Sequence, residues 1–227
     1  MKAVKLGICG LGTVGSGTFN VLTRNAAAIA ARAGRPIEIS HIGARRDNPN
    51  ADTGGVKVSR DIFDVVNDAE IDVVVELIGG SDGLAKKVAI SALKNKKHVI
   101  TANKALIAKH GNYLSYLAEK NKVNFEYEAS VASGIPIIRC IKEGLISNKI
   151  FKLIGILNGT SNYILSRMEQ TGKNFNEILK EAKKFGYAEN NPKSDLNGDD
   201  VASKIRILSS LCFHTLISKN NILIDGI

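Results

Sequence analysis

The sequence has no tryptophan, only four prolines and only three cysteines among its 227 residues. It also lacks any apolar run near the roughly 18 residues that a membrane-spanning helix requires, so we expect no membrane helix. The first apolar run, over residues 1–8, is short and stops at glycines, unlike a secretory signal peptide. A cytoplasmic location is therefore expected.

Cysteine is too sparse to form a disulfide framework. Cys9, Cys140 and Cys212 are far apart, odd in number and without C-x-x-C spacing, which also argues against a zinc site. We expect all three to be small, buried apolar side chains.

Acidic residues are outnumbered, with 22 Asp and Glu against 31 Lys and Arg, which gives a net charge of +9. The lysines are spread over expected helices without interleaved aromatic residues, and no RNA-binding or zinc-finger motif appears. We interpret them as solvated helix faces and expect no nucleic-acid partner. The positive field still favours anionic small ligands such as dinucleotides.

Residues 1–130 alternate between short apolar strands and longer amphipathic segments. Strands are expected at 4–9, 37–42, 72–78, 98–101 and 123–127, and helices at 14–33, 61–67, 83–94 and 104–120. This alternation predicts βαβ units around a parallel sheet, hence a Rossmann-type α/β domain.

Residues 131–227 have a different pattern and are expected to form a second, α+β domain that binds substrate. Its helices are expected at 135–143, 161–170, 175–185 and 200–211, with one strand at 152–157 and an acidic loop at 186–199. We find no internal repeat.

Residues 10–15 match the dinucleotide-binding pattern G-x-G-x-x-G between an expected strand and an expected helix. Gly10 permits a tight turn, Gly12 lets a pyrophosphate approach the backbone, and Gly15 lets helix and sheet pack closely. The helix start at Thr13 and Val14 then offers free N–H groups to the phosphates. The alternative is a glycine-rich turn that binds nothing.

The second expected strand runs into Arg45 and Arg46, with no acid before Asp47. NAD-binding domains usually carry an acid there for the ribose 2′-hydroxyl, whereas two guanidinium groups suit a 2′-phosphate. The pattern therefore favours NADP over NAD, the alternative being a solvated basic turn.

Further candidates follow two other strands. Gly79 and Gly80 follow one, where they would allow close approach of a ligand or merely form a turn. Thr101 and Lys104 follow the next, which brings a hydroxyl and an amine to the same edge of the sheet.

Acidic residues and a lysine crowd together late in the chain: Glu189, Asp195, Asp199, Asp200 and Lys204. Asp200 and Lys204 are four residues apart, so they share a helix face and can form an ion pair. A lysine held among carboxylates suits a proton donor. Acid-rich loops before helices more often serve only as caps.

Several segments together resemble the homoserine dehydrogenase family, in that family's usual motif order. They are residues 10–15, 75–80, 101–108, 130–138, 155–165 and 182–204, the last two being the most specific. The family usually has a glycine where Ser133 stands and often an aspartate where Asn191 stands; neither change removes a catalytic group.

The resemblance implies NAD(P)H-dependent interconversion of L-aspartate 4-semialdehyde and L-homoserine, a step towards threonine and methionine. It implies that Lys204 donates the proton, that Asp200 orients it, and that Lys104 lies near the nicotinamide and the reacting oxygen. Glu189 and Asp195 would hold the amino-acid end of the substrate.

The resemblance also implies a sodium ion on the backbone carbonyls of Glu128, Val131, Ser133 and Ile135, and a homodimer built through the second domain. The chain stops at Ile227, where the family continues through further strands and often a regulatory domain. We therefore expect a truncated form. The alternative to an enzyme is a non-catalytic NAD(P)-binding or scaffold protein.

Overall fold

The computed structural model describes residues 1–227 and divides into two compact units, Met1–Gly134 and Ile135–Ile227. The boundary expected from the sequence, after residue 130, lies a few residues earlier. No helix in either unit combines the length and the apolar character needed to span a bilayer.

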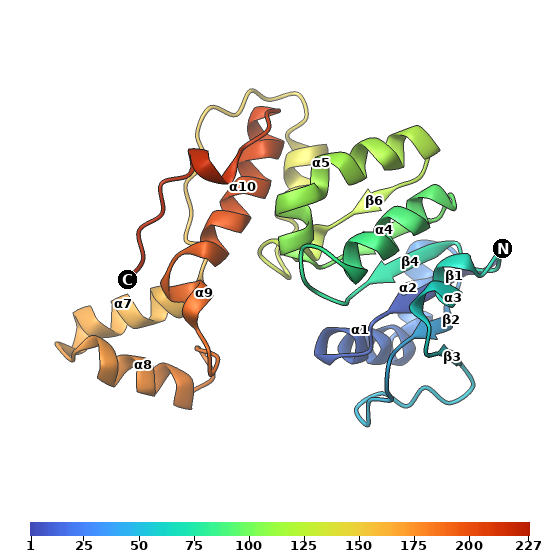
Figure 1. Ribbon diagram of the computed structural model, residues 1–227, viewed down its shortest axis with the longest axis horizontal. Coiled ribbons are helices and arrows are strands. Elements are labelled where there is room, and N and C mark those ends of the chain that lie inside the picture. Colours follow the sequence, from blue (N-terminus) through green and yellow to red (C-terminus); the bar gives the residue numbers. More distant parts are fainter. The chain divides into compact units, whose positions relative to one another are not determined.

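The first unit is built on one six-stranded parallel sheet (Figure 1). Its strands are β1 (Val4–Cys9), β2 (Ile37–Gly43), β3 (Lys57–Ser59), β4 (Val73–Glu76), β5 (His98–Thr101) and β6 (Phe125–Glu126). They lie in the order β3-β2-β1-β4-β5-β6, so the direction of winding reverses between β1 and β4. This order confirms the Rossmann-type fold expected from the sequence.

Five helices cover this sheet: α1 (Thr13–Arg24), α2 (Ala26–Ala33), α3 (Ile62–Asn67), α4 (Leu84–Lys94) and α5 (Lys104–Asn121). α1 contacts α2, whereas α3, α4 and α5 contact one another in series, in keeping with right-handed crossovers that wind in two directions from the centre of the sheet. Helices on both faces explain why the central strands are apolar throughout, with Val74 and Val75 of β4 both buried.

The core beside α1 joins that helix to the three strands nearest to it. Phe19 of α1 packs in one cluster with Ile8 of β1, Ile42 of β2 and Val75 of β4. Burying large side chains of this kind stabilises the fold by roughly 1.5–3 kcal/mol each.

Two local predictions for this unit were wrong. The single helix expected over 14–33 is two helices, because the backbone leaves the helical conformation at Asn25, with φ −103° and ψ 15°. Asparagine is a weak helix former. Strand β3 was not expected at all. With three residues at the edge of the sheet, it is too short to show alternation in the sequence.

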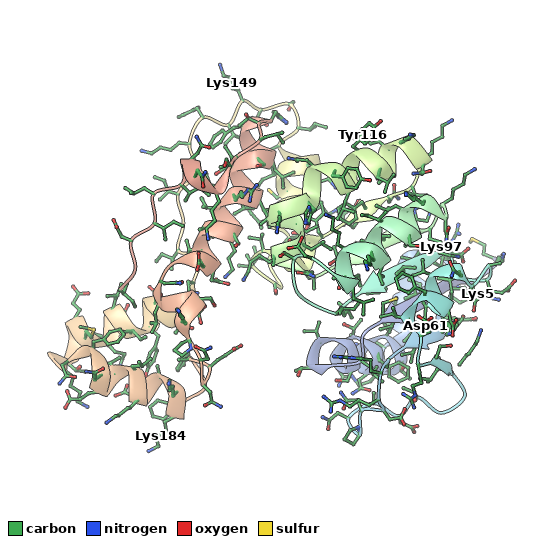
Figure 2. The ribbon with its side chains drawn as sticks, viewed as in Figure 1. Lys5, Asp61, Lys97, Tyr116, Lys149 and Lys184 are labelled. Carbon is green, nitrogen blue, oxygen red and sulfur yellow. The ribbon has the colours of Figure 1, made fainter.

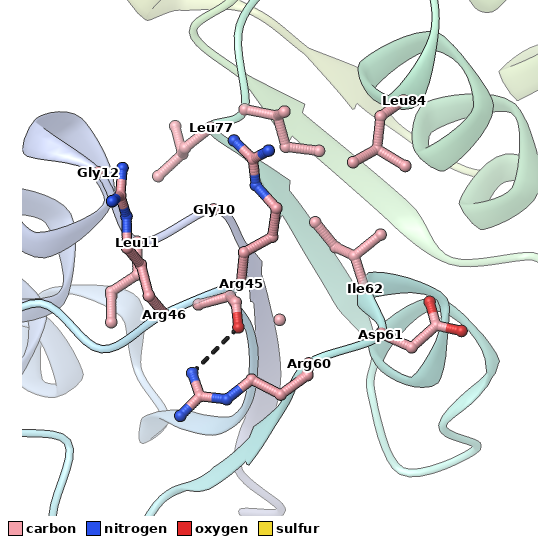
Figure 3. Close-up of a pocket in the computed structure, with 13 residues that line it drawn as sticks. Gly10, Leu11, Gly12, Arg45, Arg46, Arg60, Asp61, Ile62, Leu77 and Leu84 are labelled. Atoms are coloured by element: carbon pink, nitrogen blue, oxygen red, sulfur yellow. Dashed lines mark hydrogen bonds between the residues drawn. The ribbon is translucent and has the colours of Figure 1, made fainter.

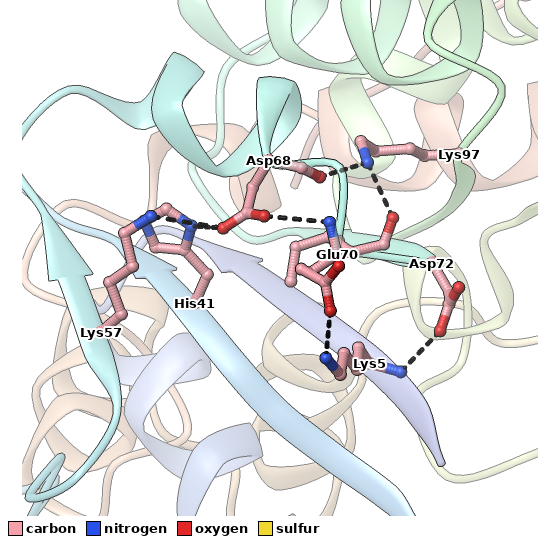
Figure 4. A network of polar contacts seen from close by, with 8 residues as sticks. Lys5, His41, Lys57, Asp68, Glu70, Asp72 and Lys97 are labelled. Carbon is pink, nitrogen blue, oxygen red and sulfur yellow. Dashed lines mark hydrogen bonds and ion pairs between the residues drawn. The ribbon is translucent and has the colours of Figure 1, made fainter. Parts of the chain in front are cut away.

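A polar network ties the turn after α3 to the sheet (Figure 4). The buried His41 of β2 bonds Asp68 at 2.7 Å and Ser59 at 2.8 Å, and the Lys97 ammonium donates to the carbonyl of Asp68 at 2.6 Å. The backbone N–H of Glu70, and after it His41 and Lys57, hold the pKa of Asp68 below its usual value. The network satisfies polar groups that the sheet would otherwise bury without partners.

The second unit, as far as residue 227, is helical. Its helices are α6 (Ile137–Arg139), which continues as a π turn at Cys140–Gly144, then α7 (Gly159–Thr171), α8 (Phe175–Lys184), α9 (Lys193–Leu196) and α10 (Asp199–Phe213). Helices α7 and α8 lie side by side (Figure 1), and Ile164 of α7 packs in one cluster with Ile178 and Ala182 of α8. A capping box formed by Asn174 and Glu177 starts α8.

The strand expected over 152–157 does not form, and that prediction was wrong. The residues have no regular secondary structure, and Phe151, Ile154 and Ile156 are each more than three-quarters exposed. A strand needs a neighbour to pair its backbone groups, and residues 135–227 contain no other strand.

The cysteines also depart in part from expectation. Cys9 and Cys212 are buried, and burial raises the pKa of the Cys9 thiol to about 12. Cys140 is exposed, so the prediction of a buried side chain was wrong there. It begins the π turn at Cys140–Gly144, whose one buried residue is Ile141.

The glycine at position 15 gives a direct test of how α1 packs onto the turn after β1. A Cβ atom on Gly15 would lie 2.0 Å from the carbonyl oxygen of Gly10, whereas one on Gly17 would meet no atom within 4 Å. We expect Gly15→Ala to destabilise the protein by about 1–3 kcal/mol. Gly17→Ala, the control in the same helix, should be neutral or stabilising by about 0.5–1 kcal/mol. Urea unfolding measures both, and equal stability of the two variants would contradict the packing.

Candidate active site

The turn from β1 into α1 forms an open, positively polarised helix end. Gly10 has φ +103°, and a Cβ atom there would lie 2.7 Å from the carbonyl oxygen of Leu77. Gly12 caps α1 without a side-chain hydrogen bond, and a Cβ on it would meet no atom within 4 Å. Thr13 and Val14 are exposed. The first N–H groups of α1 therefore face an open space that an anion could occupy.

A pocket of about 410 Å³ opens beside this turn (Figure 3). It is lined by Gly10, Leu11, Gly12, Gly43, Ala44, Arg45, Arg46, Arg60, Asp61, Ile62, Leu77, Ile78 and Leu84. These residues follow the carboxyl ends of β1, β2, β3 and β4, at the point where the strand order reverses. Ligands of doubly wound sheets bind at this point.

Three guanidinium groups surround the pocket (Figure 3). Arg45 and Arg46 are exposed and form no ion pair. Arg60 instead binds both carboxylate oxygens of Asp47, at 2.9 and 3.0 Å, and the carbonyl of Ala44 at 3.1 Å. The nearest acid after β2 is thus already paired. The sequence reasoning missed Arg60 because it missed β3, the strand that places it.

A second group of candidates is connected by a series of hydrogen bonds at the ends of β4 and β5. The fully buried Glu76 accepts from the Thr101 hydroxyl at 2.6 Å, and that hydroxyl accepts from the backbone N–H of Asn103 at 2.9 Å. Asn103 donates to the carbonyl of Gly80 at 2.7 Å, and its side-chain oxygen caps α5. These hydrogen bonds thereby fix the start of α5, whose first residue is Lys104.

Gly79 and Gly80 make this arrangement possible through their backbone conformation. Both have positive φ values, 86° and 82°, which residues with a Cβ rarely adopt. Of the candidates in this unit, Gly10, Gly12, Arg45 and Arg46 line the pocket. Thr13, Val14, Gly15, Gly79, Gly80, Thr101 and Lys104 belong to the same turns and strand ends without lining it.

In the second unit, Lys204 lies on α10 within a polar cluster. Its ammonium pairs with Asp200 at 2.8 Å, the four-residue spacing expected from the sequence, and donates to the carbonyl of Leu157 at 2.5 Å. Lys204 and Asp200 are each only partly exposed, so this ion pair is less screened than a surface pair.

Asp195 joins the same cluster through residues that the sequence reasoning quoted only as part of a motif. Asn158 donates to Asp195 at 2.8 Å and to Asp200 at 3.1 Å, and the Thr160 hydroxyl lies 3.3 Å from the second Asp195 oxygen. The sequence signal that could have found Asn158 is an asparagine at the position that caps the helix after it, α7.

Two other acids lie outside this cluster. Glu189 is exposed and makes no hydrogen bond or ion pair. Asp199 instead pairs with Lys219 at 2.9 Å, and that hydrogen bond, together with Asn197, lowers the pKa of Asp199. The acidic segment therefore supplies two positioned carboxylates, Asp195 and Asp200, and one free carboxylate.

The segment suggested for a sodium ion is a turn with local backbone bonds. The carbonyl of Glu128 accepts from Val131 at 3.5 Å, that of Ile135 accepts from Ile137 at 2.8 Å, and the Ser133 hydroxyl donates to Ala129 at 3.2 Å. A carbonyl oxygen has two lone pairs, so one backbone hydrogen bond does not by itself exclude a cation. No group of three or more His, Cys, Asp or Glu side chains has the arrangement of a metal site.

Comparison with known proteins extends over nearly the whole chain. Residues 10–128 match the model of the homoserine dehydrogenase NAD-binding domain, and residues 136–227 match that of homoserine dehydrogenase. A homoserine dehydrogenase from Pseudomonas aeruginosa is 53% identical over 227 residues, which are all of this chain and 52% of the relative.

Solved structures agree with this match. A homoserine dehydrogenase from Thiobacillus denitrificans superposes with a TM-score of 0.92 at 47% identity, over all of this chain and 53% of the other. A putative homoserine dehydrogenase from Archaeoglobus fulgidus gives 0.86 at 32% identity, over 98% of this chain and 72% of the other. The chain spans about half the length of the curated relatives it matches.

The buried contact between Thr101 and Glu76 can be tested by an isosteric change. Thr101→Val removes the donor to a fully buried carboxylate, which should destabilise the protein by about 1–3 kcal/mol. It should also weaken dinucleotide binding, because the contact fixes the end of β5. Thr18→Val on α1 is the control, since that hydroxyl bonds only within its own exposed helix. Thermal unfolding with and without NADPH checks both, and a Thr101→Val protein as stable as the control would contradict the role of this contact.

Proposed function

The chain belongs to the homoserine dehydrogenase family, and we propose that the protein interconverts L-aspartate 4-semialdehyde and L-homoserine with a nicotinamide cofactor. The observation that carries the proposal is the Lys204–Asp200 ion pair, held with Asp195 in one cluster of the unit that matches the homoserine dehydrogenase model. Glycine loops occur in many dinucleotide-binding proteins, whereas this cluster offers a proton donor beside carboxylates.

Dinucleotide binding falls to the first unit. Gly12 and the exposed start of α1 receive the pyrophosphate, and Gly10 and Gly15 give the turn its shape. The match to an NAD-binding domain and the pocket beside the turn support this assignment. The nicotinamide end of the cofactor is assigned to residues at the ends of β4 and β5, namely Gly79, Gly80, Thr101 and Lys104. When bound, the cofactor supplies or accepts the hydride.

NADP is the preferred cofactor in this proposal. Arg45 and Arg46 line the pocket and have no acidic partner, so both can bind the extra phosphate. Asp47, the nearest candidate for a ribose hydroxyl, is held by two hydrogen bonds from Arg60. An acid paired in this way is a weaker acceptor for the NAD ribose than a free one.

The substrate is handled by the second unit together with Lys104. Lys204 donates a proton from Nζ to the oxygen on which negative charge develops during reduction, and accepts it back in the reverse direction. Asp200 orients that amine. Lys104 stabilises the same oxygen, while Asp195 and the exposed Glu189 bind the ammonium group of the amino acid.

Two further assignments are carried over from the family resemblance. The carbonyls of Glu128, Val131, Ser133 and Ile135 bind a sodium ion, a hard cation that suits oxygen ligands. The protein forms a homodimer through its second unit. Sodium titration of activity and sedimentation of the purified protein test these two assignments separately.

The lysines give the most direct mutational test. Lys204→Ala and Lys104→Ala should each lower kcat for homoserine oxidation at least about 100-fold, the usual contribution of a positioned acid–base group. Lys184→Ala, at the exposed end of α8, is the matched control and should leave kcat unchanged (Figure 2). Absorbance at 340 nm follows turnover, and melting temperatures check folding. Cofactor binding without turnover in the unaltered protein would favour the scaffold alternative.

Cofactor choice can be tested by removing the two unpaired guanidinium groups. The double change Arg45→Ala and Arg46→Ala should raise the Kd for NADPH about 10- to 100-fold, because it removes charge-assisted hydrogen bonds worth about 1.5–3 kcal/mol. The Kd for NADH should change little. Arg32→Ala on α2 controls for lost charge. Fluorescence titration measures the constants, and a clear preference of the unaltered protein for NADH would refute the NADP assignment.

A further inference from the structure

One amide group connects the two positioned carboxylates of the second unit. The Nδ2 atom of Asn158 donates to Oδ1 of Asp195 at 2.8 Å and to Oδ2 of Asp200 at 3.1 Å. Asn158 is only 7% exposed, so its amide is largely shielded from water, whereas the two carboxylates are partly exposed. Because an amide nitrogen carries two hydrogens, both donors are used and none is left for another partner.

The same side chain also fixes a helix. Its Oδ1 atom accepts from the backbone N–H of Ser161 at 2.8 Å and so caps α7. Asp195 lies on α9 and Asp200 in the first turn of α10. Asn158 therefore joins three helices at one point, with its acceptor directed to one helix and its donors to the other two.

The position of the Lys204 amine also depends on Asn158 and its neighbours. Lys204 donates to the carbonyl of Leu157, the residue directly before Asn158. It also pairs with Oδ2 of Asp200, the oxygen that accepts from the Asn158 amide. A shift of Asn158 would therefore move both partners of the amine.

We propose that Asn158 is a positioning residue, one that sets Asp195 for substrate binding and Asp200 with Lys204 for proton transfer through its two N–H donors. This inference rests on the proposed function, because it assigns no new reaction. Two carboxylates that share one nitrogen repel each other, and the amide hydrogens together with the Lys204 ammonium offset that repulsion. A residue without donors cannot take this role.

Asn158→Asp separates positioning from capping. Aspartate caps helices as well as asparagine does, so α7 keeps its cap. The NH2 group that supplied both N–H donors is replaced by an oxygen, which makes the side chain a third carboxylate beside Asp195 and Asp200. Asn174→Asp is the matched control. Asn174 caps α8 in the same way, and its side chain contacts neither Asp195 nor Asp200.

Steady-state kinetics of homoserine oxidation form the first arm of the test. Asn158→Asp should lower kcat at least about 10-fold and raise KM for homoserine several-fold, whereas Asn174→Asp should leave both within about twofold. A purely structural loss would reduce the active fraction, which lowers kcat and leaves KM unchanged. That outcome, or wild-type values of both constants, would overturn the proposal.

The second arm needs no turnover and therefore separates this proposal from the proposed function. The side-chain amide signal of Asn158 in a ¹H–¹⁵N spectrum should shift in Asp195→Asn and in Asp200→Asn, and stay in place in Glu189→Gln. Shifts in the two aspartate variants, in a protein that does not oxidise homoserine, would support the positioning contacts and overturn the proposed function. An unmoved signal in both would overturn the positioning role.

Discussion

The reversal of strand order between β1 and β4 is the constraint on which the first unit depends. Neighbouring crossovers leave in opposite directions there, so no connection covers the carboxyl ends of the two strands. The backbone must turn sharply beside that opening, which requires Gly10, and α1 must pack directly onto the turn, which requires Gly15. The remaining features of the pocket, including Arg45 and Arg46, follow from strands that end at the same edge.

The main constraint in the second unit is that two carboxylates of like charge lie close together. Asp195 and Asp200 lie near each other because Asn158 donates to both and Lys204 pairs with one. The cluster is thus a balance between repulsion and donated hydrogen bonds. The cluster thereby holds an amine beside two carboxylates, which is what the proposed reaction needs.

Much of the first unit could be predicted from the sequence, because its strands are apolar on both faces and its turns contain glycine. The central strands and the helices after them follow from that pattern alone. The three-residue β3 could not be predicted, since its position depends on pairing with β2, and Arg60 was missed with it. In the second unit, the four-residue spacing predicted the Lys204–Asp200 pair. Its link to Asp195 through Asn158 spans residues about forty apart in the chain and depends on tertiary packing.

The central claim is that this protein transfers hydride between a nicotinamide and the aldehyde carbon of aspartate semialdehyde. The most direct test is to incubate the protein with aspartate semialdehyde and with NADPH that carries deuterium as the transferable hydrogen at C4 of the nicotinamide. Mass spectrometry then analyses the amino-acid product. The account predicts homoserine with one deuterium on its C4 carbon. Unlabelled homoserine, or no homoserine from a protein that binds the cofactor, would contradict it.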